Sequence, residues 1–296
     1  MTPAVLLNGK SSLSRPRTAI VVEGGGLRGA FCAGVLSTLH RIGIRLPDYL
    51  LGTSAGAPSA AFMATGQIEN AIRLWENHTH ASHLVSFRHL LKGRPLMDID
   101  KLVSTFKAPD PLDVCTLEDG PSQVFIAATH CITGQAEYLR LRKHNAFEVL
   151  TATMALPGAY GKVVRVDGHP YIDGGASASI PLQPALVSEI ENILVILTRP
   201  PGYRKKTSQG RGTVYKLQYP QYPEAVRALI ERGTNYNREL ETVERLEAEG
   251  RLTVIRPQAP LPASRMTRNR NLILDTIQVG REQAQVWFPQ HGSRFA

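Results

Sequence analysis

The chain has 296 residues, of which 43% are hydrophobic and 20% charged, so it can bury a sizeable core and is neither disordered nor fibrous. This length allows one large α/β domain or two smaller ones. Lys and Arg number 34 against 25 Asp and Glu, and the resulting net charge of +9 makes nucleic acid or an anionic membrane the first partner to test.

The signals for targeting and oxidation point to the cytoplasm. The first twenty residues lack the basic start and long apolar run of a signal peptide, and no run of about 18 apolar residues predicts a membrane-spanning helix. The three cysteines, Cys32, Cys115 and Cys131, include no C-x-x-C pair and predict neither a disulfide framework nor a zinc site. We therefore expect a cytoplasmic protein whose membrane contact, where it occurs, is peripheral.

Two successive strand-turn-helix units follow a tail over residues 1–17. Residues 18–22 form the first apolar strand, and a glycine-rich turn leads to a helix over 30–42. Residues 49–51 form the second strand, which turns into a helix of small residues from 56 to 65. Repeated units of this kind predict an α/β fold with a central, mostly parallel sheet and right-handed crossovers.

The rest of the chain continues this pattern. Residues 67–111 are polar and helical in pattern, and we expect them to form a lid. Asp167-Gly168 predicts a type I′ hairpin turn. Further strands are expected at 124–129, 137–141, 163–166, 170–172, 193–198 and 252–255, and further helices at 147–154 and 223–249. We expect residues 18–186 to form a catalytic core and residues 187–296 to complete the same domain.

The loop from Gly24 to Gly29 matches G-x-G-x-x-G, the phosphate-binding turn of dinucleotide-binding folds. That fold also needs an acidic residue about 20 positions later, at the end of the second strand. Asp48 is near that distance but precedes the second strand. The cofactor interpretation therefore lacks its second requirement.

Residues 52–56, Gly-Thr-Ser-Ala-Gly, match G-x-S-x-G, which marks a tight strand-to-helix turn that exposes a serine hydroxyl. Ser54 is the candidate nucleophile, and the following helix directs free N–H groups toward it. The alternative is a chance pentapeptide in which Ser54 is a turn residue.

The glycine-rich loop also suits an oxyanion hole, because residues without Cβ let several backbone N–H groups converge on one oxygen. The side chain of Arg28 either adds positive charge to this loop or pairs with an acid to hold it. Both roles stay open at this point.

The base that would activate Ser54 is the deciding question. An α/β-hydrolase triad runs serine, acid, histidine along the chain, but only His291, close to the last residue, follows Asp173. A carboxylate that contacts the serine directly needs no histidine, and Asp173 suits that role because it ends a hairpin arm before two glycines. The alternative is a turn aspartate in an Asp-Gly pair.

Taken together, these motifs resemble the patatin-like phospholipases, a family of lipid acyl hydrolases, most closely in the style of bacterial members. GGGLRG at 24–29, GTSAG at 52–56 and DGG at 173–175 occur in the expected order, and Ala155-Leu156-Pro157 precedes the last. The resemblance covers about residues 19–184. It implies a three-layer fold in which helices sandwich the central sheet, with a helical lid region and a catalytic dyad of Ser54 and Asp173.

The resemblance also implies further site residues. The implied oxyanion hole comprises Gly24, Gly25, Gly26, Leu27, Arg28 and Ala55. The glycines that complete the motifs are Gly29, Gly52, Gly56, Gly174 and Gly175. Neither a metal nor another cofactor is implied. Thr153 replaces a serine that many members have, and we expect this difference to leave catalysis intact.

The implied activity is hydrolysis of carboxylic esters of phospholipids or related lipids, of a phospholipase A or lysophospholipase-like kind, through an acyl-enzyme. The alternative is a non-catalytic protein that binds an anionic surface, a membrane or nucleic acid. We find no nucleic-acid-binding motif, and 6% aromatic residues offers few stacking platforms. We therefore expect a lipid or ester substrate and no nucleic-acid partner.

Other polar clusters have simpler structural explanations. Asp98 is predicted to cap a helix over 99–106 rather than to pair with Asp100 in catalysis, and Trp75 is predicted to pack in a helix rather than to anchor lipid. Four histidines lie near one another without the spacing of a metal motif, and we interpret them as surface residues of the lid: His78, His80, His83 and His89.

The segment 199–222 holds the densest positive charge in the chain. Its basic residues are Arg199, Arg204, Lys205, Lys206, Arg211 and Lys216, and its tyrosines are Tyr203, Tyr215, Tyr219 and Tyr222. A solvated loop is the simpler interpretation, and peripheral contact with an anionic lipid surface is the alternative. Because the tail, this segment and residues 261–296 hold the excess charge, the inferred core is not basic.

Overall fold

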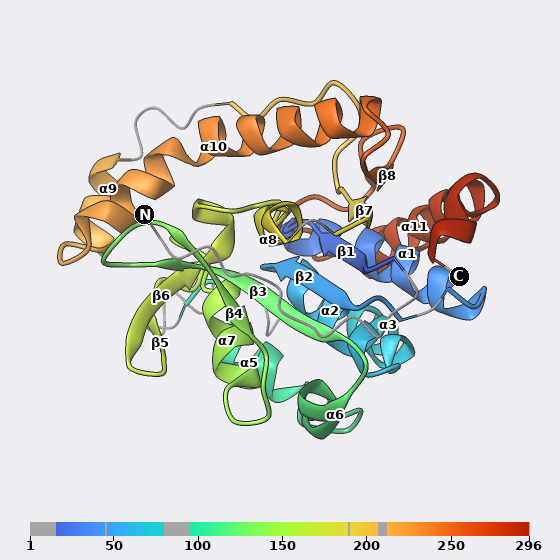
Figure 1. Cartoon of the computed structure of the whole chain (residues 1–296). Coiled ribbons are helices and arrows are strands. Elements are labelled where there is room, and N and C mark those ends of the chain that lie inside the picture. Colours follow the sequence, from blue (N-terminus) through green and yellow to red (C-terminus); the bar gives the residue numbers. More distant parts are fainter. Residues whose placement is uncertain (1–15, 45, 80–94, 189, 207–211, 296) are drawn as a thin grey trace.

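The computed structural model describes residues 16–44, 46–79, 95–188, 190–206 and 212–295. Within these residues, eight strands form a single sheet that lies between two layers of helices (Figure 1). The α/β sandwich predicted from the sequence is confirmed.

The elements have the following bounds. The strands are β1 (Thr18–Val22), β2 (Tyr49–Thr53), β3 (Gln123–His130), β4 (Ala136–Arg140), β5 (Val164–Val166), β6 (His169–Asp173), β7 (Asn192–Ile196) and β8 (Thr253–Ile255). The helices are α1 (Ala30–Arg41), α2 (Gly56–Ala64), α3 (Ile68–Asn77), α5 (Ile99–Ser104), α6 (Val114–Asp119), α7 (Ala146–Thr153), α8 (Gln183–Val187), α9 (Gly212–Gln218), α10 (Pro223–Ala248) and α11 (Arg270–His291). Short 3₁₀ turns are η1 (Gly26–Gly29), η2 (Gly174–Ala176) and η3 (Gly292–Phe295).

The sheet has the order β5-β6-β3-β2-β1-β7-β8, with β4 paired to β3. The strands from β3 through β8 in this order run parallel, whereas β4, β5 and β6 are antiparallel additions. Because parallel strands all end at one edge, the loops after β1 and β2 are brought together there, and the end of β6 lies beside β3.

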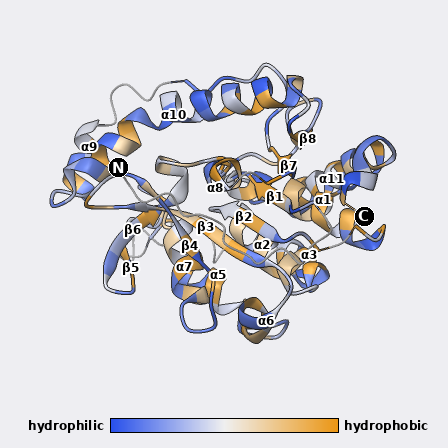
Figure 2. Cartoon of the chain, viewed as in Figure 1, coloured by the Kyte–Doolittle hydropathy of each residue, from blue (hydrophilic) through white to orange (hydrophobic). Residues whose placement is uncertain are grey.

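Alternate residues of β1 separate the two halves of the core. Ile20 and Val22 face the helices α1, α2, α7 and α11, and Ala19 and Val21 face α8 and α10. Figure 2 shows the apolar colouring concentrated on the strands and on the helices beneath them, while the long helix α10 alternates along its length. A sheet buried on both faces explains why its strands read as continuous apolar runs.

Most predicted elements are confirmed to within one or two residues, including the hairpin turn, where Asp167 and Gly168 both have positive φ (48° and 83°). The sequence pattern predicts none of α6, α8, α9 and α11. In α11 the apolar residues are interrupted by glycine and proline, yet Gly280 packs so closely on α1 that a Cβ would lie 2.2 Å from the carbonyl oxygen of Phe31. The helix therefore depends on a tertiary contact that its own hydrophobic pattern does not indicate.

The segment 67–111 is helical in part, over α3 and α5, and its residues 80–94 lie outside the described chain. Within the described residues, we find no helix with both the length and the apolar character needed to cross a membrane.

Candidate active site

Ser54 lies in the sharp turn between β2 and α2, and its φ of 51° is unusual for a residue with a side chain. The flanking glycines are required by space. A Cβ on Gly52 would lie 2.9 Å from the Cα of Ala57, and one on Gly56 would lie 2.7 Å from the carbonyl oxygen of Glu23. The turn therefore has the strained geometry expected of a G-x-S-x-G nucleophile.

Asp173 is the last residue of β6, and its side chain reaches Ser54 directly. The Oδ2 atom accepts a hydrogen bond from Ser54 Oγ at 2.8 Å, and Oδ1 accepts one from the N–H of Gly175 at 2.8 Å. Both side chains are buried, with 5% of Ser54 and 1% of Asp173 exposed. Two residues separated by 119 positions are thus held in the contact that a serine-carboxylate pair requires.

Packing around the end of β6 explains the Asp-Gly-Gly motif. A Cβ on Gly174 would lie 2.0 Å from the carbonyl oxygen of Ala127 in β3. The backbone of Asp173 donates to the carbonyl of Ala155 at 3.1 Å and accepts from the hydroxyl of Thr129 at 2.9 Å. The carboxylate is therefore positioned by its own main chain.

Thr153, at the end of α7, supports the serine turn from behind. Its Oγ1 accepts the N–H of Ser54 at 2.8 Å and donates to the carbonyl of Ala127 at 2.6 Å. A serine hydroxyl has the same donor and acceptor capacity, so this contact gives a physical reason for the expectation that threonine is tolerated. In the sequence, Thr153 stands out only as a departure from the family pattern, because a contact across 99 residues leaves no local signal.

The backbone N–H groups near Ser54 divide into bonded and unbonded ones. Gly24 donates to the carbonyl of Ser179 at 3.0 Å, and Leu27 donates to the carbonyl of Arg265 at 3.1 Å. The N–H groups of Gly25 and Ala55 make no hydrogen bond with any other described residue. Gly25 and Ala55, both among the residues implied for an oxyanion hole, therefore offer free donors.

Arg28 does not form an ion pair that would hold the loop. Within the described chain no carboxylate oxygen lies within 4.0 Å of its guanidinium, and its Nε is buried without a hydrogen-bond partner. Burial, followed by the charge of Arg199, lowers the pKa of Arg28 to about 10. Its side chain therefore contributes positive charge next to the loop.

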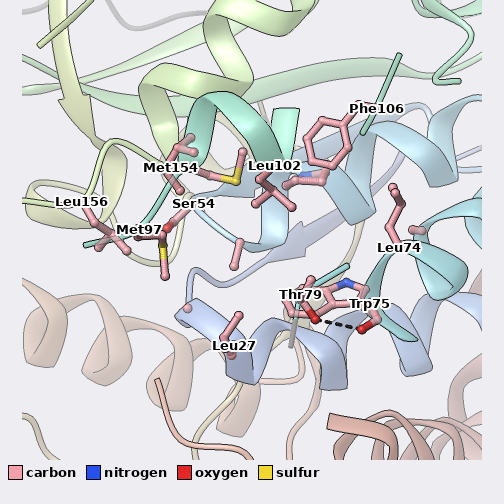
Figure 3. A pocket seen from close by; sticks show the side chains of 15 residues that line it. Leu27, Ser54, Leu74, Trp75, Thr79, Met97, Leu102, Phe106, Met154 and Leu156 are labelled. Carbon is pink, nitrogen blue, oxygen red and sulfur yellow. Dashed lines mark hydrogen bonds between the residues drawn. The ribbon is translucent and has the colours of Figure 1, made fainter. Parts of the chain in front are cut away.

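Two cavities of opposite character meet at Ser54. The first is apolar and lies between the serine turn, α3 and α5. Figure 3 shows the Ser54 oxygen toward one end of this cavity, and Leu74, Trp75 and Phe106 toward the other. It is lined by Gly26, Leu27, Ser54, Ala55, Pro58, Ala71, Leu74, Trp75, Thr79, Met97, Ile99, Leu102, Phe106, Met154 and Leu156.

The second cavity is polar and has a volume of about 150 Å³. It shares Gly26 and Ser54 with the apolar cavity and is lined by Glu23, Gly24, Gly25, Arg28, Gly175, Ser179, Arg199, Tyr203, Lys205, Arg232, Tyr236 and Arg265. Arg232 and Arg265 are not predicted as site residues, because nothing in their local sequence shows that α10 and the loop before α11 return to Ser54.

The basic segment after β7 does not behave as a single charged surface. Arg199 and Lys205 turn inward to the polar cavity, whereas Arg204 pairs with Glu244 in α10 at 2.7 Å. Lys206 and Lys216 are exposed, and Arg211 lies outside the described residues. All four tyrosines are at least partly buried in apolar clusters. The interpretation of these charges as one solvated loop is therefore wrong for Arg199 and Lys205.

Other candidates fall into structural roles. Asp98 caps α5 by accepting the N–H of Lys101 at 3.0 Å, as predicted, and Asp100 accepts from Tyr160 and Lys162. His291 ends α11 with its ring against Trp287 and lines neither cavity at Ser54. Trp75, predicted to pack within its helix, lines the apolar cavity as well.

No group of three or more metal-ligating side chains occurs among the residues that the structure describes. His78 ends α3, and His80, His83 and His89 fall in the segment 80–94, outside the described residues.

Comparison with known proteins identifies the same region. Residues 20–186 match the family model "Patatin-like phospholipase", and residues 222–295 match a "Domain of unknown function (DUF6363)". The chain is 33% identical over 187 residues to the uncharacterized protein YjjU of Escherichia coli, which covers 62% of this chain and 52% of that protein.

It is also 25% identical over 183 residues to the uncharacterized NTE family proteins Mb1092c of Mycobacterium bovis and Rv1063c of Mycobacterium tuberculosis, covering 62% of this chain and 48% of each. The match thus spans about half the length of these curated relatives. Among solved structures, VipD from Legionella pneumophila aligns with a TM-score of 0.46 and 11% identity over 94% of this chain and 67% of its own. Because the family model covers more than half of the sequence and includes both Ser54 and Asp173, the chain belongs to the patatin-like phospholipase family.

Proposed function

We propose that this protein is a lipid acyl hydrolase that cleaves carboxylic esters with Ser54 as nucleophile and Asp173 as general base. The observation that carries the proposal is the 2.8 Å hydrogen bond between Ser54 Oγ and Asp173 Oδ2, at the place where an apolar and a cationic cavity meet. The family match supports the same reaction class.

In the proposed reaction, Asp173 accepts the Ser54 proton while Oγ bonds to the ester carbonyl carbon. The N–H groups of Gly25 and Ala55, which lack other acceptors, hold the oxyanion. As the ester bond breaks, the proton passes from Asp173 to the departing alcohol oxygen. Water then gives a proton to Asp173 and its hydroxyl to the acyl carbon, and the carboxylic acid leaves as the Ser54 hydroxyl is restored.

The apolar cavity is the proposed place of the acyl chain. Its lining is almost entirely aliphatic and aromatic, and the only hydroxyl groups in it are those of Ser54 and Thr79. The Thr79 hydroxyl is already bonded to the carbonyl of Trp75 at 2.8 Å (Figure 3). This composition favours a phospholipase A or lysophospholipase-like activity, in which a fatty acyl group is transferred to the serine and then released.

The test is the turnover of a p-nitrophenyl ester by the wild type, Ser54→Ala and Asp173→Asn. Each variant is expected to lose about 1000-fold or more in kcat, and Ser54→Ala also loses covalent labelling by a fluorophosphonate. Ser59→Ala is the matched control, since this buried serine of α2 has no hydrogen-bond partner within the described chain. Undiminished activity in either dyad variant contradicts the proposal.

The alternative is a binding protein for an anionic surface. Contact with an anionic membrane has support from Lys216, Val214 and Leu217, which are exposed together on α9. Binding to anionic vesicles without any Ser54-dependent labelling would favour this alternative. The cytoplasmic location remains a prediction.

We also infer that residues 187–296 complete the catalytic domain that begins at residue 18. Its support is that β7 pairs with β1 inside the sheet, that β8 pairs with β7, and that α10 covers the same face as α8.

A further inference from the structure

The polar cavity beside Ser54 is bordered by five basic side chains, from Arg28, Arg199, Lys205, Arg232 and Arg265. Its volume of about 150 Å³ is many times the roughly 10–15 Å³ that a single water needs. The cavity therefore has room for a ligand of several atoms. None of the steps proposed for ester hydrolysis uses these charges.

The acidic side chains nearby compensate only part of this charge. Glu23 accepts hydrogen bonds from the N–H and the hydroxyl of Thr198, and Glu239 accepts the N–H of Ile180 at 3.0 Å. Asp173 accepts the hydrogen bond of Ser54, and its Oδ1 forms a long ion pair with Arg232 at 4.0 Å.

Within the described chain, no carboxylate oxygen lies within 4.0 Å of the charged nitrogens of Arg199 or Lys205. The charges of Arg199 and Lys205 are thus unpaired, and the five basic side chains outnumber Glu23, the one acidic side chain that lines the cavity.

The pKa values of two of these side chains also reflect their burial close to other positive charges. Burial, followed by the charges of Arg232 and Arg265, lowers the pKa of Lys205 to about 7. Burial, followed by Arg199, lowers that of Arg28 to about 10. An anion bound among these groups would stabilise their charged forms. Such a site is prepared to receive negative charge from a ligand.

Several observations favour a terminal phosphate over a phosphocholine group. Guanidinium groups bind phosphate oxygens in pairs of hydrogen bonds, and four of the five cations are arginines. A quaternary ammonium would need an aromatic face or an acid. Yet Arg199 already lies 4.2 Å from the centre of the Tyr203 ring, and Lys205 lies 4.9 Å from that of Tyr236.

We propose that this cavity binds a terminal phosphate on the alcohol side of the ester, so that the protein selects acylglycerol phosphates over neutral or zwitterionic esters. This inference rests on the proposed hydrolase function. Because Ser54 and Gly26 border both cavities, an ester whose acyl chain fills the apolar one directs its alcohol into the cationic one.

The origin of the basic side chains gives the C-terminal region a role. Only Arg28 belongs to residues 20–186, whereas Arg199 and Lys205 follow β7, and Arg232 and Arg265 lie within residues 222–295. The segment that matches a domain of unknown function therefore supplies part of the proposed phosphate site.

The experiment compares three esters with the same decanoyl chain, whose alcohols are glycerol 3-phosphate, glycerol and glycerophosphocholine. The wild type is expected to prefer the phosphate ester by about tenfold or more in kcat/KM. Arg199→Gln and Lys205→Met are each expected to lower kcat/KM for the phosphate ester about tenfold, as loss of one hydrogen bond to a charged group does. The glycerol ester should change by less than about twofold.

Arg204→Gln is the matched control, because its side chain pairs with Glu244 at the surface and not with the cavity. It is expected to leave all three esters unaffected. An equal loss on all three esters in Arg199→Gln and Lys205→Met, or a wild-type preference for the phosphocholine ester, overturns the phosphate site.

A binding measurement separates this inference from the hydrolase function. Calorimetry with Ser54→Ala should detect sn-glycerol 3-phosphate, with tighter binding than inorganic phosphate, and the added change Lys205→Met should weaken it about tenfold. Binding without turnover in the wild type would contradict the hydrolase and retain the anion site. Turnover without binding, or equal binding of both anions, would contradict the head-group site.

Discussion

The two cavities at Ser54 are built from different parts of the chain and offer a ligand different kinds of interaction. Every residue that lines the apolar cavity lies within residues 20–186, whereas most of the charge in the cationic cavity comes from residues after 186. In an apolar cavity, binding strengthens with the length of the acyl chain, because each buried methylene adds about the same free energy. A cationic cavity instead binds a negatively charged group at one fixed position. We therefore expect the first to set the acyl chain length and the second to set the head group.

The largest expected effect is on chain length. In the wild type, kcat/KM should rise about three- to fourfold per methylene from acetyl to octanoyl p-nitrophenyl esters, on the order of 1000-fold in all. Leu102→Glu places a charge in the cavity and should remove most of this rise.

The volume-conserving change Leu102→Met is the control and should keep the rise. A uniform loss on short and long esters by Leu102→Glu, with unchanged thermal unfolding, would contradict the role of the apolar cavity.

The next effect concerns the boundary between the cavities. Thr153→Val leaves the N–H of Ser54 and the carbonyl of Ala127 without their partner. Because an unsatisfied buried group costs about 1–3 kcal/mol, we expect kcat to fall roughly 10- to 100-fold with little change in KM. Thr153→Ser keeps the hydroxyl and should keep the activity. Equal rates for both variants would show that this bridge does not position the serine.

The smallest effect concerns the acid beside the cationic cavity. Burial raises the pKa of Glu239 from 4.5 to about 8, so at neutral pH the folded protein holds a proton here that the unfolded chain releases. The contribution of Glu239 to the free energy of unfolding is therefore full below pH 4.5 and is lost as the pH rises toward 8.

Glu239→Gln should remove this loss, so its stability relative to the wild type should increase by about 1 kcal/mol or more between pH 5 and pH 8, measured by urea unfolding. Glu241→Gln, at an exposed position of the same helix, is the control. A difference that does not change with pH would mean that Glu239 is charged in the folded protein and partly neutralises the cavity.

Local pattern was sufficient wherever the physics is local. The apolar runs of β1 and β2 and the turns after them can be read directly, because buried parallel strands are continuously apolar and tight turns need glycine. The pairing of Ser54 with Asp173 also followed from the motifs, although their separation could not be measured from the sequence. The sequence pattern does not predict helix α11, because the close contact with α1, and not the hydrophobic pattern of the helix, explains Gly280.

The sequence by itself determined the α/β class, the order of the main elements, the turn that holds Ser54 and the aspartate that contacts it. Only the tertiary structure decided which N–H groups near Ser54 are free, that Thr153 supports the turn, and that Arg199, Lys205, Arg232 and Arg265 gather in one cavity. The physical reason is that a motif reflects the backbone shape of one turn, whereas a cavity is formed by side chains from segments far apart in the chain. The net charge of +9 illustrates this difference, since composition counts charges but not the direction in which they point.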